Sequence, residues 1–180
     1  MNDEDFRRWG QRAVEWSADY RSKLRERPVR PNIEPGTIAR QLPSAAPEAG
    51  EPMAAIFADF ERLIVPAMTH WQHPRFFAYF AANAAPVSVI AELLTAAIGA
   101  QCMLWQTSPA ATELEQVVVG WLAAALGLPP AFKGVIQDSA SSATFSAVLT
   151  MRERALGFAG NRDGLAGGPA VRIYSSAEVH

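Results

Sequence analysis

The sequence predicts an α/β chain in which helices come first and a strand–helix–strand unit follows. Before Gly127, apolar side chains recur every three or four residues over several stretches, which is the period of an amphipathic helix. Two short apolar runs, 134–137 and 171–174, then flank a stretch of helical period that extends from Phe145 to about residue 156. This order predicts two buried parallel strands joined by a right-handed crossover.

Residues 3–24 are expected to form the first helix. Asn2 is its expected N-cap, and the acidic residues that follow suit the positive end of the helix dipole. Steps of three and four place five apolar side chains on one face, namely Phe6, Trp9, Ala13, Trp16 and Tyr20. Two interpretations of this stripe stay open: it packs on the chain's own core, or it packs on a partner subunit.

A proline-rich connector follows the first helix. Six of the 13 prolines lie within residues 28–52, which excludes regular helix and interior strand there. The second helix is expected to open at Pro52 and to end or kink at Pro66. Its expected buried face consists of Met53, Ile56, Phe57, Phe60, Leu63 and Ile64.

Two more helices are expected before the strands. One covers about residues 86–101, and the other begins at the Ser108-Pro109 cap and stops at Gly127. The inward face of the earlier one is expected to consist of Val87, Ile90, Leu93, Leu94, Ala97 and Ile98. Residues 157–168 hold five glycines and predict a mobile surface loop.

The composition is that of a globular chain long enough for one domain. The 180 residues are 49% hydrophobic and 19% charged, which excludes wholesale disorder. A formal net charge of −2 gives no sign of binding to nucleic acid or to an anionic membrane. The single cysteine excludes an internal disulfide framework and a cysteine-based zinc site. The acidic N-terminus lacks a secretory h-region, and the stretch 84–103 is too polar for a membrane span, so we expect a cytoplasmic chain.

Residues 138–144 are expected to form a loop of small residues, and its part 139–144 is the sharpest local feature. Backbone N–H groups at a helix start form an anion site, for which phosphate is the usual occupant. The segment lacks the glycines and lysine of a Walker loop and the glycines of a dinucleotide fingerprint, so a nucleotide is not implied. The alternative is ordinary N-capping by Ser139, Ser141 or Ser142.

The histidines do not predict a metal site. His70 and His73 are three residues apart, but Pro74 and the lack of a nearby carboxylate argue against a metal pair. His180 follows the second expected strand, where a ligand could be reached if the chain continues beyond it.

Longer blocks of the sequence carry a family resemblance. They are residues 71–80 (WQHPRFFAYF), 104–115 (LWQTSPAATELE), 134–144 (GVIQDSASSAT) and 174–180 (YSSAEVH). In order and spacing these blocks resemble the group II pyridoxal-phosphate decarboxylases, in particular the aromatic-L-amino-acid decarboxylase branch. The resemblance extends over the whole chain and covers well under half of a family subunit.

The resemblance implies a fold, a cofactor and a partner. Residues 1–80 would form an N-terminal helical arm that is swapped between the subunits of a homodimer, and residues 81–180 would begin an aspartate-aminotransferase-like large domain. The cofactor would be pyridoxal 5'-phosphate, with Ala140 and Ser141 at its phosphate and His180 stacked on its ring. The implied substrate-side residues are Trp71, Tyr79, Phe80 and Met103, and the implied activity is that of a carboxy-lyase that converts an aromatic L-amino acid to its amine and carbon dioxide.

The chain departs from the family pattern at several positions. Ala81 and Ala82 follow Phe80 where proline and then threonine or serine are usual, which favours a substrate ring less polar than that of dopa. Ser142 stands where many members have glutamate. The two lysines, Lys23 and Lys133, are not in the context of the family's Schiff-base lysine. That lysine and the aspartate on the ring nitrogen are therefore expected beyond residue 180, and the chain alone is not expected to be a complete enzyme.

Two further functions stay open. The chain could be a non-catalytic fragment that serves as a dimerisation or binding module. It could also belong to a decarboxylase of another amino acid, such as glutamate or histidine.

Overall fold

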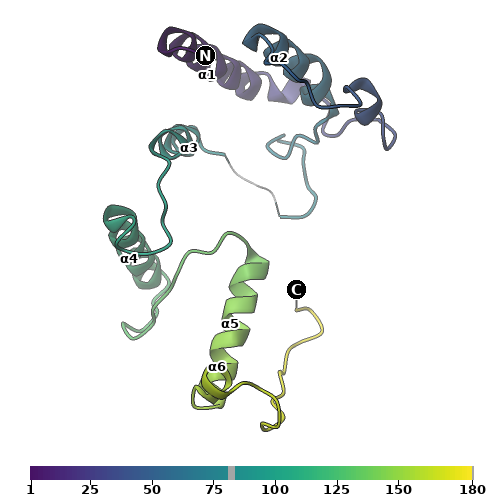
Figure 1. The fold of residues 1–180 in the computed structure, drawn as a ribbon. Helices are drawn as coiled ribbons and strands as arrows, with labels where there is room; N and C mark the ends of the chain where they lie inside the picture. Colours follow the sequence, from purple (N-terminus) through teal and green to yellow (C-terminus); the bar gives the residue numbers. More distant parts are fainter. Residues whose placement is uncertain (81–83, 180) are drawn as a thin grey trace. The chain divides into compact units, whose positions relative to one another are not determined.

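The computed structural model describes residues 1–80 and 84–179. Within these ranges the secondary structure is helical, with no strand (Figure 1). The chain divides into two compact units, Met1–Leu94 and Thr95–His180.

The first unit opens with α1, Asp3–Ser22, which confirms the expected first helix. The Asn2 side chain accepts a hydrogen bond of 2.8 Å from the Asp5 N–H, as an N-cap should. Within the stripe, the Trp9 ring lies 5.6 Å from the Phe57 ring. The Trp16 ring lies 4.8 Å from the Phe60 ring. The chain's own next helix therefore covers the middle of the stripe, whereas Phe6 stays 58% exposed.

The second helix is shorter and less regular than its expected span. It consists of α2, Met53–Asp59, then a π-helical turn, Phe60–Ile64, and a 3-10 turn, Val65–Ala67. Proline has no N–H to continue an α-helical ladder, which explains the change at Pro66. On the expected buried face Leu63 is buried, but Ile56 and Ile64 are 46% and 36% exposed, so the expectation is wrong for those two.

Helix α4, Pro109–Ala125, lies where the sequence predicts it, and α3, Pro86–Ile98, starts as predicted but ends about three residues earlier. Each is followed by a glycine with positive φ, 63° at Gly99 and 67° at Gly127, a backbone conformation that glycine adopts without a steric penalty. The expected inward face of α3 is not buried: Val87 and Ile98 are 76% and 77% exposed. Helical period locates an apolar face, but burial also needs a second surface, and the described residues do not bury this face.

The second unit does not confirm the predicted strands. Residues 134–137 and 171–174 are irregular. Glu115 of α4 accepts the Ile136 N–H at 2.7 Å. A Cβ on Gly134 would lie only 2.7 Å from the Val119 side chain, so α4 approaches this segment closely. A strand exists only through hydrogen bonds to a neighbouring strand, and the described residues provide none.

The helix after this segment begins earlier than expected. Helix α5 spans Ala140–Ala155, so most of the presumed loop 138–144 is its first turn. The glycine-rich stretch 157–168, expected to be a mobile loop, contains a short helix, α6, Ala159–Asp163. The buried Glu153 carboxylate organises it, because it accepts the Asn161 N–H at 2.9 Å and pairs with Arg152 at 2.7 Å.

In the part of the chain that the structure describes, no helix is both long enough and apolar enough to span a membrane.

Candidate active site

The aromatic segment, residues 70–80, contains a cluster of three aromatic rings in contact. The Trp71 ring lies 4.8 Å from the Phe76 ring, at an angle of 38° between the ring planes. It lies 5.7 Å from the Tyr79 ring, at an angle of 25°. Tyr79 adopts φ of 53°, which is unusual for a residue with a side chain. Tyr79 and Phe80 are 90% and 97% exposed, so the cluster offers open aromatic faces.

Two buried histidines anchor the start of the aromatic segment. His70 and His73 are each 3% exposed. The His70 N–H donates to the Val29 carbonyl at 2.9 Å, and the His73 N–H donates to the His70 carbonyl at 2.9 Å. The Tyr20 hydroxyl of α1 lies 2.8 Å from His70 Nδ1. A residue of the first helix therefore fixes the residue next to Trp71.

Burial and charge keep this anchor neutral. Burial lowers the pKa of His70, and the nearby Arg27 and His73 lower it further. Burial also raises the pKa of Tyr20, which the charge of Arg27 partly offsets. The Arg27 guanidinium lies 5.3 Å from the centre of the Tyr20 ring. A neutral phenol and a neutral imidazole can share one proton in a hydrogen bond without burying a charge.

The His73 ring accepts one hydrogen bond from the backbone. Its Nδ1 accepts the Arg75 N–H at 3.0 Å, so a neutral ring carries its proton on Nε2. That Nε2 is buried and has no hydrogen-bond partner among the described residues. No group of three or more potential ligand side chains (His, Cys, Asp or Glu) that could hold a metal ion occurs among the residues that the structure describes.

A second set of candidate residues lies at the start of α5, in the other unit. Ser139 is the N-cap, and its hydroxyl accepts the Ser142 N–H at 3.2 Å. The Ser139 carbonyl accepts the Ala143 N–H at 3.0 Å. The N–H groups of Ala140 and Ser141 precede the first intrahelical bonds and point out of the helix start. N-capping by Ser139, one of the two alternatives, is thus confirmed, and it leaves these two donors available to a ligand.

Met103 lies between α3 and α4 in a connecting segment held by local bonds. The Thr107 hydroxyl donates to the Gln101 carbonyl at 2.7 Å, and Trp105 Nε1 donates to Glu113 at 2.9 Å. Met103 itself is 76% exposed.

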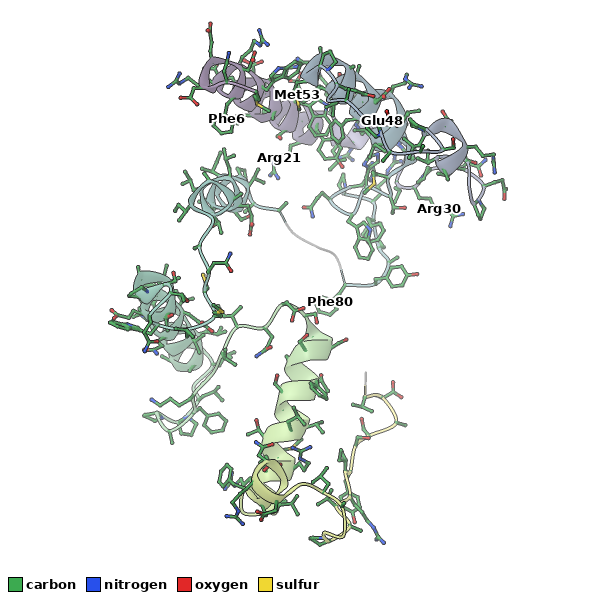
Figure 2. All side chains as sticks on the ribbon, in the orientation of Figure 1. Phe6, Arg21, Arg30, Glu48, Met53 and Phe80 are labelled. Atoms are coloured by element: carbon green, nitrogen blue, oxygen red, sulfur yellow. The ribbon has the colours of Figure 1, made fainter. Side chains whose placement is uncertain are left out.

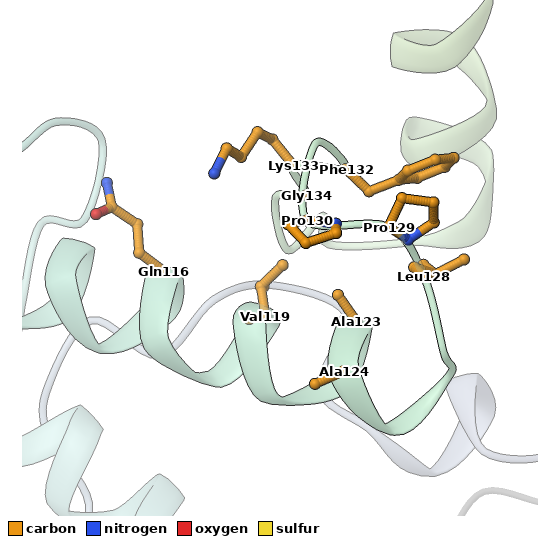
Figure 3. A pocket seen from close by; sticks show the side chains of 11 residues that line it. Gln116, Val119, Ala123, Ala124, Leu128, Pro129, Pro130, Phe132, Lys133 and Gly134 are labelled. Carbon is orange, nitrogen blue, oxygen red and sulfur yellow. The ribbon is translucent and has the colours of Figure 1, made fainter.

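A cavity of about 650 Å³ lies between α4 and residues 128–134 (Figure 3). Its walls are mostly apolar, and Lys133 is the one charged residue among the described residues that line it. None of the site residues expected from the sequence lines this cavity.

The structure brings two of the expected residues together, Trp71 and Tyr79. Phe80 follows them in the chain and is exposed, while Met103, Ala140 and Ser141 belong to the second unit. His180, Ala81 and Ala82 lie outside the described residues. The hydrogen bond between Tyr20 and His70 was not predicted from the sequence. The one local sign of it is the Tyr20 hydroxyl, a polar group on an otherwise apolar helix face.

Comparison with known proteins agrees with the resemblance. The pyridoxal-dependent decarboxylase conserved domain matches residues 35–163. The chain is 41% identical to the aromatic-L-amino-acid decarboxylase of Mus musculus over 164 residues, 87% of this chain and 34% of that protein. It is also 41% identical to the histidine decarboxylase of Drosophila melanogaster over 165 residues, 87% of this chain and 20% of that protein.

A solved structure shows the same fold over most of the chain. The crystal structure of Catharanthus roseus tryptophan decarboxylase in complex with L-tryptophan has a TM-score of 0.82 and 36% identity. The match covers 91% of this chain and 35% of that one. This chain thus spans only 20–35% of the length of these relatives. With the domain match covering most of its residues, the chain belongs to the pyridoxal-dependent decarboxylase family.

Proposed function

We propose that the protein containing this chain is a pyridoxal-phosphate-dependent decarboxylase that converts an aromatic L-amino acid to its amine and carbon dioxide. The observation that carries the proposal is the stacked pair Trp71 and Tyr79, on a segment that matches an aromatic-L-amino-acid decarboxylase. Aromatic side chains bind an aromatic substrate through stacked or edge-to-face contacts.

The start of α5 fits the cofactor's phosphate. Its donor set comprises the N–H groups of Ala140 and Ser141 and the Ser141 hydroxyl, and no acidic side chain lies in the first helical turn. The positive end of the helix dipole adds to this attraction. When bound, pyridoxal phosphate supplies an electron-accepting ring. In the proposal Ala140 and Ser141 hold the phosphate, and His180 stacks on the ring.

The remaining residues shape the substrate side. Trp71, Tyr79 and Phe80 are proposed to form an apolar wall, and Met103 is proposed as a further substrate-side residue. Such a wall excludes water and favours the loss of a charged carboxylate from the substrate. The exposed faces of Tyr79 and Phe80 support this role, because they are free to contact a ligand.

Residues 1–80 are proposed to form the arm of a homodimer, and residues 81–180 the first part of the large cofactor domain. Phe6 and the apolar face of α3 are exposed, which supports the proposal that other parts of the protein or a partner subunit cover them. A cytoplasmic location is also proposed, and the single cysteine, Cys102, supports it because a lone cysteine forms no internal disulfide framework.

Histidine is the second candidate substrate. The identity to the Drosophila melanogaster histidine decarboxylase equals that to the mouse aromatic-amino-acid enzyme, 41% in both cases. Identity alone therefore does not separate the two substrates.

A substrate panel tests the proposal. The protein that contains this chain, loaded with pyridoxal phosphate, is assayed for carbon dioxide release from L-tryptophan, L-tyrosine, L-phenylalanine, L-histidine and L-glutamate. The proposal expects the highest kcat/KM for one of the three aromatic amino acids. A preference for histidine favours the second candidate, and no release from any of them indicates a non-catalytic role.

A further inference from the structure

Tyr20 and Arg21, near the C-terminal end of α1, form hydrogen bonds to residues before and after the exposed side chains of Tyr79 and Phe80. Tyr20 bonds to His70, which begins the aromatic segment. Arg21 donates from its guanidinium to the carbonyl of Ala84, four residues after Phe80. Figure 2 labels Arg21 and Phe80.

The contact at the start is buried and specific. His70 is 3% exposed, and its Nδ1 lies 2.8 Å from the Tyr20 hydroxyl. Its backbone N–H is bound to Val29 at 2.9 Å, so both the side chain and the backbone of His70 are held. Trp71 is the next residue and cannot shift far without breaking one of these bonds.

The contact after the segment involves both polar groups of one peptide unit. The Ala84 carbonyl accepts from Arg21, and the Ala84 N–H donates to Gln72 Oε1 at 3.0 Å. Gln72 is the neighbour of Trp71. Ala84 is thereby tied at once to α1 and to the beginning of the aromatic segment.

Helix α1 is itself fixed within this unit. The ring contacts of Trp9 with Phe57 and of Trp16 with Phe60, at 5.6 and 4.8 Å, hold it against α2 and the π-helical turn. Tyr20 and Arg21 therefore extend from an anchored base, rather than from a helix free to move with the segment.

We propose that Tyr20 and Arg21 are positioning residues for the substrate-side wall of Trp71, Tyr79 and Phe80. They touch neither substrate nor cofactor; they hold the start of the segment and the residue Ala84 beyond its end, which fixes where the aromatic rings stand. The inference rests on the proposed function for its kinetic consequence, but its structural consequence does not depend on activity.

The experiment uses the protein that contains this chain, loaded with pyridoxal phosphate. Arg21→Met removes the donor, Arg21→Lys keeps a positive donor, and Arg25→Met removes an exposed arginine just beyond the same helix. For each variant three quantities are measured: amide hydrogen exchange over residues 71–80, cofactor content by absorbance, and kcat and KM for L-tryptophan.

Arg21→Met is expected to speed exchange over residues 71–80 and to raise KM about five- to tenfold, the range of one typical intramolecular hydrogen bond at an exposed side chain. Because Arg21 is proposed not to contact the cofactor, kcat and cofactor content of Arg21→Met should change less than about twofold. Arg21→Lys should recover part of the loss, and Arg25→Met should match the unaltered protein. A purely structural role would lower cofactor content and kcat together.

Unchanged exchange over residues 71–80 in Arg21→Met would overturn the inference, as would a parallel fall of kcat and cofactor content. If Arg21→Met does not fold, Tyr20→Phe, which removes only a hydroxyl, is measured in its place with the same expected exchange. If the unaltered protein releases no carbon dioxide, the proposed function fails while the exchange measurement still decides the inference.

Discussion

The Tyr20 hydroxyl and His70 Nδ1 lie 2.8 Å apart although the two residues are 50 positions apart in the chain. This bond joins α1 to the segment that begins at one of the most buried side chains described, and it places α1 next to the candidate substrate wall. The N-terminal helix thus has a structural role near the site as well as its proposed role in a dimer.

Tyr20→Phe is expected to lower the free energy of unfolding by about 1–2 kcal/mol, because the buried His70 ring loses its partner while the aromatic ring is kept. Urea unfolding measures the change. Tyr174→Phe is the matched control: Tyr174 is 87% exposed, and its change should stay within about 0.5 kcal/mol. Equal effects of the two substitutions would show that the bond to His70 contributes nothing.

The stability of the protein is expected to fall in mild acid through His70. Its pKa is lowered in the folded state by burial and by Arg27 and His73, so below the unfolded value of about 6.5 the unfolded chain binds more protons. The contribution of His70 is present above that value and is lost as the pH falls toward its folded pKa. Urea unfolding between pH 8 and pH 5.5 measures this, and His70→Gln should flatten the dependence. An unchanged slope in His70→Gln would assign the acid sensitivity to other groups.

Ser141→Ala is expected to weaken cofactor binding by about tenfold or more, through loss of one charge-assisted hydrogen bond to phosphate. Titration of the cofactor-free protein with pyridoxal phosphate measures the affinity. Ser139→Ala is the informative comparison, because Ser139 is the N-cap and its loss should lower stability by about 1 kcal/mol. A loss of stability without a change in affinity in Ser141→Ala would contradict the proposed phosphate site.

His180→Ala is expected to lower turnover far more than it lowers cofactor content, if the imidazole stacks on the ring as the family resemblance implies. Single-turnover kinetics and cofactor absorbance are measured on the same preparation. Equal loss of both quantities would assign His180 a structural role.

The starts of α1 to α4 could be predicted because the signals that set them are local. Asn2 caps α1, Pro52 precedes α2, proline opens α3 and α4, and Gly127 follows the end of α4. Each signal acts within a few residues of the place it marks, so a single sequence contains all that is needed.

The strands and buried faces could not be predicted in the same way, because both depend on a second surface. Residues 134–137 have the apolar character of a strand, but the Ile136 N–H goes to the Glu115 side chain. Val87 and Ile98 follow the helical period and are exposed nonetheless. Strand pairing and the burial of a helix face each depend on two segments, whereas the period of apolar residues describes only one segment.

In the candidate site, too, the contact within one sequence block could be predicted and the contacts between distant residues could not. Trp71 and Tyr79 were expected together because a family block contains both, and their rings do stack. The bonds from Tyr20 to His70 and from Arg21 to Ala84 span 50 and 63 positions, and no local pattern announces them.

The central claim is tested most directly by the stoichiometry of the reaction with a carboxyl-labelled aromatic amino acid. The protein that contains this chain, loaded with pyridoxal phosphate, is incubated in turn with carboxyl-labelled L-tryptophan, L-tyrosine and L-phenylalanine, and for the preferred substrate labelled carbon dioxide and the amine are counted together. We expect equal amounts of the two products, and none from protein stripped of pyridoxal phosphate. Release of no labelled carbon dioxide from tryptophan, tyrosine or phenylalanine would contradict the assignment.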